Sequence, residues 1–140
     1  FLVDQSQIAE SQTDEEFVLT RGARLHEIHH TILGLPITVA GEAAATAFYA
    51  STGSNPSQIG ILSSWMLRGA YEPSERRLIW DAIGFGIAVG QVVPELFSPR
   101  WEEGWEKPIT DWQDELGISE VLKTSPFQDE FATVYGFNLQ

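Results

Sequence analysis

The sequence contains no cysteine among its 140 residues. A disulfide framework, a thiolate zinc site, a thiol nucleophile and thiol redox chemistry are therefore excluded. Positive charge is also scarce, because eight lysines and arginines stand against 20 aspartates and glutamates and leave a formal net charge of −12. Nucleic acids and anionic lipids are bound by clustered basic side chains. Their scarcity argues against nucleic-acid binding and against a polybasic membrane anchor.

Long uninterrupted hydrophobic runs are missing as well. Residues 1–16 lack the basic-then-apolar layout of a signal peptide. The most apolar stretch, residues 78–97, contains Asp81 and Glu95, which favours a buried helix over a bilayer span. Hydrophobic residues nevertheless make up 43% of the chain. A chain of this size can bury roughly 68–70% of its unfolded surface, so we expect one folded domain over residues 1–140.

Helical signals cover most of the chain and predict an all-α fold, a single helical domain of about five to six helices. Thr13 is a plausible cap for the first helix, whose first turn is acidic, and Gly34 and Pro36 lie in the turn that ends it. Alternation typical of a strand occurs only at residues 132–137. We expect helices over 14–33, about 36–50, about 57–70 and about 73–96, and two short helices over 98–118 divided at Pro108.

All three histidines lie within five positions, in the segment His26-Glu27-Ile28-His29-His30. On a helix His26 and His30 are about 40° apart, so both side chains can bind one divalent ion. Glu27 lies at the edge of the same sector, whereas His29 points away from it and is the weakest ligand candidate. A solvated polar face would explain the same spacing, and the short motif alone does not decide between the two.

Glu42 is the only charged residue between Thr31 and Leu67, and it lies in a predicted helix rich in alanine. Burying a lone carboxylate is costly unless a positive group meets it. The turn after residue 33 folds the second helix back on the first, which can bring Glu42 to His26 and His30. A metal ion would then neutralise the carboxylate. The alternative is that Glu42 faces water on an exposed rim.

His26, Glu27 and His30 also match the H-E-x-x-H pattern of zinc proteases, in which the glutamate is the general base. Glu42 follows too closely to be the third ligand of that architecture, and no edge strand is evident to hold a peptide. A metal-dependent hydrolase is therefore the third of the candidate functions.

Glycines recur over residues 84–90, but the spacing does not fit a dinucleotide fingerprint and no strand precedes it. Small residues there indicate close helix packing, or room for an apolar ligand between helices. Asp81 is a second isolated carboxylate, and its simplest interpretation is an ion pair with Arg76 or Arg77.

The pattern His26-Glu27-x-x-His30, eleven residues and Glu42 resembles the signature of the coenzyme Q (ubiquinone) biosynthesis protein 4 family, which is His-Asp-x-x-His, eleven residues, Glu. Two departures from the family are visible. Glu27 stands where the family has aspartate, and Gln113 stands where its C-terminal block usually has arginine.

The surroundings resemble this family too. The Gly-x-Pro at 34–36 and the Gly-Glu at 41–42 are placed as in its members. The segments at 101–108 (WEEGWEKP) and 115–118 (ELGI) look like the C-terminal block of the family. The resemblance covers about residues 21–118.

The resemblance implies an all-α protein, peripheral to a membrane, that binds a divalent metal ion, usually zinc, through His26, Glu27, His30 and Glu42. It implies a role in ubiquinone biosynthesis, where oxidative removal of the ring carboxylate of a polyprenylated hydroxybenzoate is assigned to the family. Members also organise other enzymes of the pathway. The implied location is inside the cell, on the cytoplasmic side of a bacterial membrane or the matrix side of a mitochondrial one.

We therefore expect a metal-binding helical pair over about 14–50, beside a C-terminal block over about 98–118. An apolar interior rich in glycine and alanine would hold a long isoprenoid or prenylquinone-type lipid with its head at the metal. Zinc suits the nitrogen and oxygen ligands, and magnesium would serve if the lipid carries phosphate. The competing interpretation is a non-catalytic lipid-binding scaffold with a structural metal. Expected partners are a membrane surface, other quinone-biosynthesis proteins and a second copy of the chain.

Overall fold

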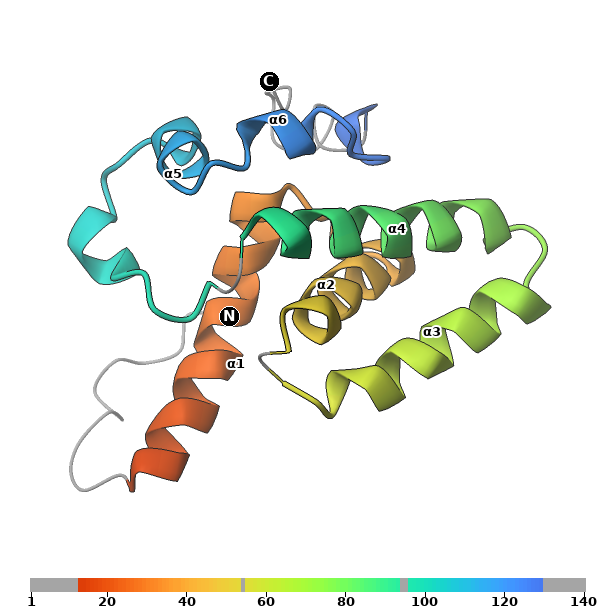
Figure 1. Ribbon diagram of the computed structural model, residues 1–140, viewed down its shortest axis with the longest axis horizontal. Coiled ribbons are helices and arrows are strands. Elements are labelled where there is room, and N and C mark those ends of the chain that lie inside the picture. The colour runs from red at the N-terminus through yellow and green to blue at the C-terminus, as the bar shows by residue number, and fades with distance from the viewer. Residues whose placement is uncertain (1–12, 54, 94–95, 130–140) are drawn as a thin grey trace.

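The computed structural model describes residues 13–53, 55–93 and 96–129, and all regular structure within them is helical (Figure 1). This confirms the predicted all-α fold; the strand suggested at 132–137 lies outside the described residues. The elements are α1 (Asp14–Leu33), α2 (Val39–Thr52), α3 (Gln58–Tyr71), α4 (Arg76–Val92), the 3-10 helix η2 (Trp101–Gly104), α5 (Ile109–Glu115) and α6 (Ser119–Leu122).

Three predicted helix boundaries shift: α4 begins at Arg76 rather than near Pro73, and the other two shifts have clear local reasons. α2 begins at Val39 rather than near Pro36, because the Thr38 hydroxyl accepts a hydrogen bond from the amide of Gly41 at 3.2 Å and caps the helix there. α4 ends at Val92 rather than near residue 96. Val93 is extended and precedes a proline in the sequence, which disfavours helical backbone at that position.

The ends of α1 agree with the sequence pattern. Thr13 and Glu16 form a reciprocal capping box, in which each side chain accepts a hydrogen bond from the backbone amide of the other. At the other end Gly34 adopts the left-handed conformation with φ 63°, which lets the chain turn directly toward α2. The histidine segment therefore lies in the second half of a well-terminated helix.

Close packing of α2 against α4 forms one side of the core. Ala43, Ala44 and Ala47 of α2 are fully buried. A Cβ atom at Gly86 of α4 would overlap the carbonyl oxygen of Ala44, so only glycine permits this approach of the two backbones. Gly86 and Gly90 of α4 thus serve helix packing, as one of the two interpretations predicted, whereas nothing lies within 4 Å of a Cβ added at Gly84. They leave no room for a ligand between α2 and α4.

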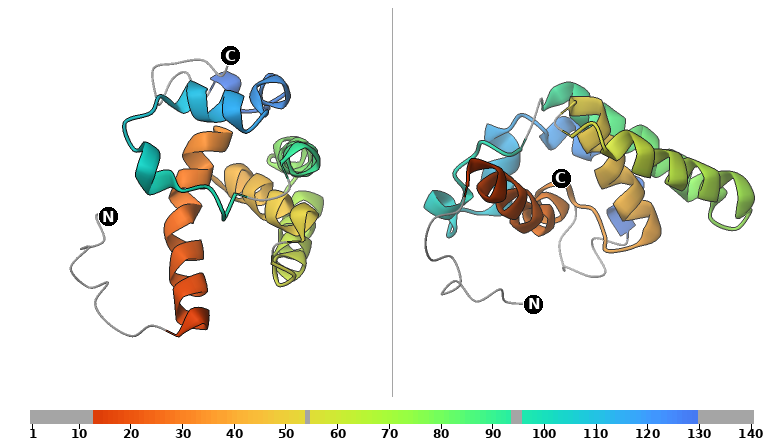
Figure 2. Two further views of the ribbon diagram at one scale, coloured as in Figure 1. Left: turned by 60° about the vertical axis from the view of Figure 1, so that its left-hand side comes forward. Right: turned by 90° about the horizontal axis from the view of Figure 1, so that it is seen from below.

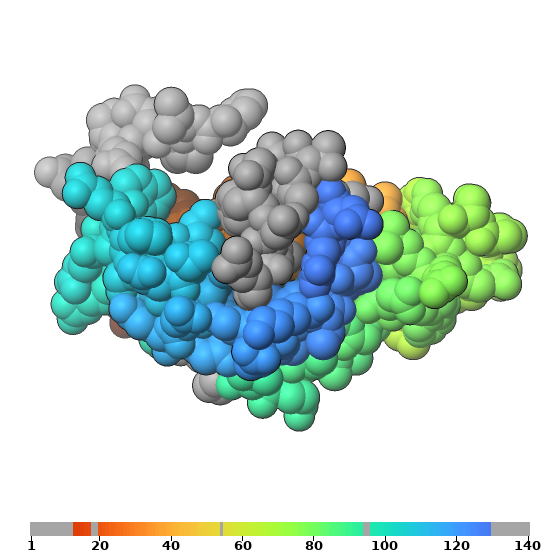
Figure 3. All heavy atoms as spheres, turned by 90° about the horizontal axis from the view of Figure 1, so that it is seen from above, coloured from red at the N-terminus to blue at the C-terminus, as the bar shows by residue number. Residues whose placement is uncertain are grey.

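The larger core lies where α1, α2 and α4 meet the C-terminal residues. Figures 1 and 2 show α5 and α6 crossing one end of α1 and α4, while α3 lies on the outer side of α2 and α4. In the space-filling view the C-terminal residues cover one face, and the α3–α4 hairpin projects to one side (Figure 3). The largest fully buried side chains of this core are Leu33, Leu35, Phe48, Val89, Leu96, Ile118, Leu122 and Phe127.

Arg21 and Gln113 make long-range hydrogen bonds that hold α1 against the C-terminal residues. The Arg21 guanidinium donates to the carbonyl oxygens of Phe97 at 3.3 Å and Pro99 at 3.0 Å. The buried amide of Gln113 donates to the carbonyl oxygen of Ile32 at 2.9 Å. Gln113, a departure from the family pattern, therefore takes part in a buried hydrogen bond between α5 and α1.

The isolated Asp81 pairs with Arg77, at 3.6 Å between the side chains, on an exposed surface of α4. This confirms one of its two predicted partners. Arg76 instead donates to the carbonyl oxygens of Gly69 and Ala70 at the end of α3. Among the described residues, no helix has the length and apolarity needed to cross a bilayer.

Candidate metal centre

His26 and His30 on α1 face Glu42 in the first turn of α2. The Nε2 atom of His26 lies 3.4 Å from Oε2 of Glu42, and the Nε2 atom of His30 lies 3.4 Å from Oε1. One ligand atom from each of the three side chains falls within 4.8 Å of the others. The turn between the two helices thus brings Glu42 to both histidines, as the sequence predicted.

The connection between α1 and α2 determines this approach. The amide of Leu35 donates to the carbonyl oxygen of His30 at 2.8 Å, which folds the chain tightly over the end of α1. A Cβ atom at position 41 would overlap the carbonyl oxygen of Pro36, so Gly41 allows the first turn of α2 to pack on the connection. The next residue is Glu42. The Gly-x-Pro and Gly-Glu segments are therefore explained by the close packing of the first turn of α2 on the connection.

His30 is 3% exposed, and a hydrogen bond of its ring shows which nitrogen carries a proton. Its Nδ1 lies 3.2 Å from the carbonyl oxygen of Leu35. A carbonyl oxygen only accepts, so Nδ1 carries a proton, and in the neutral imidazole Nε2 then carries the lone pair. Within the described residues, Nε2 is a buried atom with no hydrogen-bond partner. A histidine whose Nδ1–H donates to a carbonyl while its Nε2 is free is arranged as metal-binding histidines are.

The two histidine-to-carboxylate separations, each to a different oxygen of Glu42, are longer than direct hydrogen bonds and close to the spacing of ligands around a zinc ion. A charge-assisted N–H···O bond is about 2.7–2.9 Å long. Four ligands at about 2.0–2.1 Å from a tetrahedral zinc ion lie roughly 3.3 Å from one another. Both histidine-to-carboxylate separations are 3.4 Å. Two imidazoles and one carboxylate form a donor set that zinc commonly takes.

The group lies at the surface on one side and in the core on the other. The side chains of His26 and Glu42 are 34% and 33% exposed, whereas that of His30 is 4% exposed. The two imidazoles meet edge to face with ring centroids 4.5 Å apart. Glu42 is therefore neither fully buried nor on an open rim, and a ligand can approach the group from the His26 side.

His29 and Tyr49 form a separate polar contact behind the group. The Tyr49 hydroxyl and Nδ1 of His29 are 2.6 Å apart, and Nε2 of His29 lies 3.0 Å from the carbonyl oxygen of Leu96. That carbonyl requires a proton on Nε2, so Nδ1 accepts from the tyrosine. Burial, reinforced by the charges of Glu42 and Glu27, raises the pKa of Tyr49 above its ordinary range and keeps the hydroxyl protonated. Both side chains connect α1, α2 and the segment after α4.

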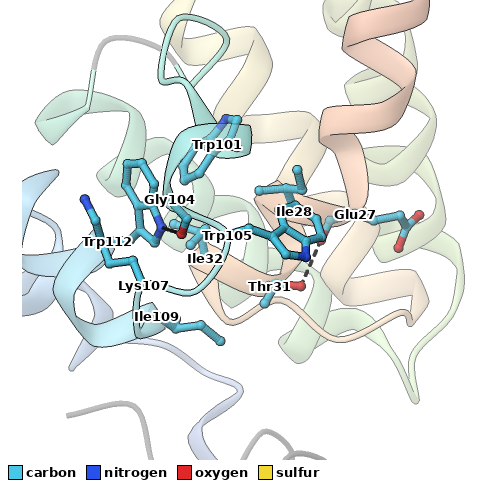
Figure 4. Close-up of a pocket in the computed structure, with 10 residues that line it drawn as sticks. All are labelled: Glu27, Ile28, Thr31, Ile32, Trp101, Gly104, Trp105, Lys107, Ile109 and Trp112. Carbon is cyan, nitrogen blue, oxygen red and sulfur yellow. Dashed lines mark hydrogen bonds between the residues drawn. The ribbon is translucent and has the colours of Figure 1, made fainter. Parts of the chain in front are cut away.

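Glu27, the fourth predicted ligand, is not part of the group of three. Its exposed side chain instead lines a neighbouring pocket, where Figure 4 shows it directed away from the tryptophans. Glu27 as a metal ligand stays a prediction.

This pocket lies between α1 and the η2–α5 segment and has a volume of about 350 Å³. Sequence reasoning did not predict this pocket. The available signal was the recurrence of tryptophan at 101, 105 and 112, but no local pattern shows which face of α1 these rings contact. The lining residues are Glu27, Ile28, Thr31, Ile32, Trp101, Gly104, Trp105, Lys107, Ile109 and Trp112 (Figure 4).

Comparison with known proteins agrees with the geometry. The model of the family "Coenzyme Q (ubiquinone) biosynthesis protein Coq4" matches residues 8–121. The "Ubiquinone biosynthesis protein COQ4, mitochondrial" of Arthroderma otae is 34% identical over 109 residues, which are 75% of this chain and 39% of the relative. Its counterpart in Sclerotinia sclerotiorum is 32% identical over 113 residues, 78% of this chain and 39% of the relative. The chain thus spans about two fifths of the length of these curated relatives.

A crystal structure of a Nostoc punctiforme protein named for ubiquinone biosynthesis has the same fold, with a TM-score of 0.69. Its sequence is 22% identical, and the match covers 79% of this chain and 54% of that one. The family model covers most of the chain, and both motif regions singled out in the sequence fall within it. The chain therefore belongs to the coenzyme Q (ubiquinone) biosynthesis protein Coq4 family.

Proposed function

We propose that this chain is a metal-binding protein of ubiquinone biosynthesis that holds an isoprenoid lipid with its polar ring at a divalent ion. The ligands would be His26, His30 and Glu42, with Glu27 as the fourth. The observation that carries the proposal is the buried, unpartnered Nε2 of His30, which faces Glu42 at 3.4 Å. The reaction proposed is oxidative removal of the ring carboxylate of a polyprenylated hydroxybenzoate: the carboxylate would leave as carbon dioxide, a hydroxyl whose oxygen comes from dioxygen would take its place, and an external two-electron donor would reduce the second oxygen atom to water.

The roles of the chain's own residues follow from their contacts. When bound, a divalent ion would act as a Lewis acid and stabilise negative charge on the ligand's head group. The carbonyl oxygen of Leu35 holds the His30 ring in the tautomer that offers Nε2. Glu42 supplies the negative charge that two neutral imidazoles lack. Zinc suits this donor set, and magnesium would suit a lipid that carries phosphate.

Metal analysis of the purified protein tests the site. We expect about one equivalent of zinc per chain for the natural sequence, and its loss in His30→Ala and in Glu42→Ala. Asp81→Ala is the matched control, because Asp81 is an exposed carboxylate paired only with Arg77 among the described contacts. Circular dichroism verifies that each variant is folded. Unchanged metal content in both site variants would overturn the proposed centre.

A non-catalytic scaffold is the second candidate, and one observation favours it. Most of the exposed large hydrophobic side chains of the described residues lie on the α3–α4 hairpin rather than beside the metal group. Such a surface suits attachment to a membrane or to other proteins of quinone biosynthesis. The exposed hydrophobic side chains of the hairpin are Ile59, Ile61, Met66, Leu67 and Tyr71 on α3, and Leu78, Trp80, Ile87 and Val92 on α4.

Charge supports placing the membrane-facing surface on the same hairpin. Residues 58–92 contain three arginines and three acidic residues, whereas the whole chain has a net charge of −12. The hairpin is therefore a neutral part of an acidic protein and meets less repulsion from an anionic lipid surface. Aromatic residues with a polar edge, such as Tyr71 and Trp80, are common at membrane interfaces. We propose a peripheral location on this basis.

Turnover separates the enzyme from the scaffold. A prenylated hydroxybenzoate labelled at its carboxyl carbon, incubated with dioxygen and a two-electron donor, should release labelled carbon dioxide with the metal-loaded protein, and should not with His30→Ala. Retention of the label by a metal-loaded protein that binds the compound would favour the scaffold. Cleavage of peptide substrates that is lost in Glu27→Gln would instead favour the hydrolase. We also propose that two copies of the chain associate, and light scattering of the purified chain tests this by giving the mass of the particle in solution.

A further inference from the structure

The two histidines of the metal group are held in different ways. The ring of His30 is fixed by its hydrogen bond to the carbonyl oxygen of Leu35. Among the contacts of the described residues, the ring of His26 has no such carbonyl partner. It lies instead between two other rings: it meets His30 edge to face at 4.5 Å between centroids, and it stacks on Tyr49 at 6.3 Å with 29° between the planes. Packing against Tyr49 therefore limits the rotation of an imidazole that a metal ion needs in one orientation.

Tyr49 is itself fixed by a hydrogen bond to the third histidine. Its hydroxyl donates to Nδ1 of His29 at 2.6 Å, and Nε2–H of His29 donates to the carbonyl oxygen of Leu96 at 3.0 Å. His29 is 5% exposed, so water cannot readily replace either bond. The Tyr49 ring cannot swing away from His26 without leaving a buried nitrogen of His29 unpaired.

The carbonyl of Leu96 is held from a second direction. The indole Nε1–H of Trp101 donates to the same oxygen at 3.3 Å, and a carbonyl oxygen has lone pairs for two donors. The ring of Trp101 also meets that of His29 edge to face, with centroids 6.3 Å apart. The carbonyl thus keeps His29 in the tautomer that accepts from Tyr49. A continuous set of contacts joins the segment after α4 to the His26 ring.

We propose that Tyr49 and His29 are positioning residues of the metal centre. The ring of Tyr49 keeps the His26 imidazole turned with Nε2 toward Glu42, and His29 keeps Tyr49 in place. Neither residue is a ligand, because both nitrogens of His29 are engaged and the Tyr49 hydroxyl is directed to His29. The histidine that was the weakest ligand candidate thereby has a role. This inference rests on the proposed metal centre, since His26 would be one of its ligands.

Metal binding by variants of Tyr49 tests the role of the ring. Competition with a chelator gives the zinc affinity, and the visible absorption of bound cobalt reports the geometry around the ion. We expect Tyr49→Leu, which removes the ring, to weaken zinc binding by about tenfold or more and to alter the cobalt spectrum. Tyr49→Phe restores the ring, so it should recover most of the affinity and the natural spectrum.

A double-mutant cycle tests the role of His29. His29→Gln offers an amide to the carbonyl of Leu96 but places no acceptor where Nδ1 was, so it removes the same hydrogen bond as Tyr49→Phe. We expect each single variant to weaken zinc binding slightly and to the same extent, and the double variant to be no weaker than either. Additive losses would contradict the proposal that His29 acts through Tyr49. The cycle also decides the matter if Tyr49→Leu does not fold.

The matched control is Phe127→Leu, which also replaces a ring by leucine in the core. Phe127 is fully buried and its ring contact is with Phe85, away from the metal group. The variant should lose stability but keep the natural zinc affinity and cobalt spectrum. An equal loss of affinity in Phe127→Leu and Tyr49→Leu would show that stability alone is responsible and would overturn the proposal.

The same measurements separate this inference from the metal centre on which it rests. Natural zinc affinity in Tyr49→Leu would overturn the positioning role of Tyr49 while the centre stands. Failure of the natural protein itself to bind zinc or cobalt would overturn the centre, and the positioning role with it.

Discussion

The Nδ1–H of His30 donates to the carbonyl oxygen of Leu35, five residues further along the chain, at 3.2 Å. The turn that ends α1 therefore also sets the tautomer of a candidate metal ligand. Local folding and site chemistry are joined in this one contact, because any displacement of residues 34–36 would move the carbonyl that keeps Nε2 free.

Gly41→Ala should destabilise the fold and weaken metal binding together. The added Cβ would overlap the carbonyl oxygen of Pro36, so the start of α2 must shift away from the turn and carry Glu42 with it. Overpacking of this kind costs about 1–3 kcal/mol. Thermal unfolding gives the stability, and titration with zinc gives the affinity.

Gly22→Ala is the control for this change. Nothing lies within 4 Å of a Cβ added at Gly22, which is an exposed position inside α1. Replacing a helical glycine by alanine stabilises a helix by about 0.5–1 kcal/mol. A loss of stability at Gly22 as large as at Gly41 would contradict the steric explanation.

Tyr49→Phe should lower stability by about 1–2 kcal/mol and leave metal content intact. The substitution removes the 2.6 Å hydrogen bond to His29 but retains the ring that packs against His26. Chemical denaturation measures the change in the free energy of unfolding. Tyr71→Phe, at an exposed position, should change it by less than about 0.5 kcal/mol.

The same tyrosine predicts a dependence on alkaline pH. The folded pKa of Tyr49 is raised, whereas in the unfolded chain the phenol ionises near pH 10. The unfolded state therefore loses its proton first, and the contribution of Tyr49 to stability is fully present below about pH 10 and declines as the pH rises beyond it. Free energies of unfolding measured across this range should fall less steeply for Tyr49→Phe. Identical slopes for the two proteins would count against the raised pKa.

Gln113→Leu should destabilise the docking of the C-terminal residues on α1. The buried amide donates to the carbonyl oxygen of Ile32 at 2.9 Å, and leucine would leave that oxygen without this donor. The expected cost is about 1–3 kcal/mol. Gln91→Leu, at an exposed position of α4, is the control and should have little effect on denaturation. Equal effects at both positions would argue against a specific role for the buried amide.

Met66→Glu combined with Leu67→Glu should abolish binding to vesicles that contain anionic lipid, because two charges would then lie on the exposed surface of α3. Co-flotation with vesicles measures the bound fraction. Thr110→Glu with Thr124→Glu adds the same charge at exposed positions of the C-terminal residues, and binding should persist. Loss of binding in both double variants would point to total charge rather than to the hairpin.

The four long helices and the meeting of Glu42 with His26 and His30 could be predicted because their causes are local. Helical periodicity places the histidines on one face, and a short turn forces the next helix back onto it. The position of Glu27 could not be predicted in the same way. It shares a sector with His26 on the helix, but the side chain lines the pocket that the C-terminal residues close.

That pocket depends on contacts between distant segments, which leave no periodic signal in the sequence. Trp105 and Trp112 could equally have packed on α4, and nothing in their spacing selects Ile28 and Ile32 as their neighbours. The hydrogen bond from Gln113 to Ile32 is of the same kind, since it joins residues 81 positions apart. Packing between distant segments, rather than local helix propensity, determines where the C-terminal residues lie on α1.

The α1–α2 pair and the docked C-terminal residues can also assemble at different times during folding. The His26, His30 and Glu42 side chains meet within one helical pair, so their contacts close short loops. The bond from Gln113 to Ile32 closes a loop of 81 positions, and the entropy lost on closure grows with loop length. Short-range contacts form faster than long-range ones during folding. The candidate ligands can therefore come together before the C-terminal residues dock, so a bound ion would favour folding of the α1–α2 pair ahead of closure of the pocket.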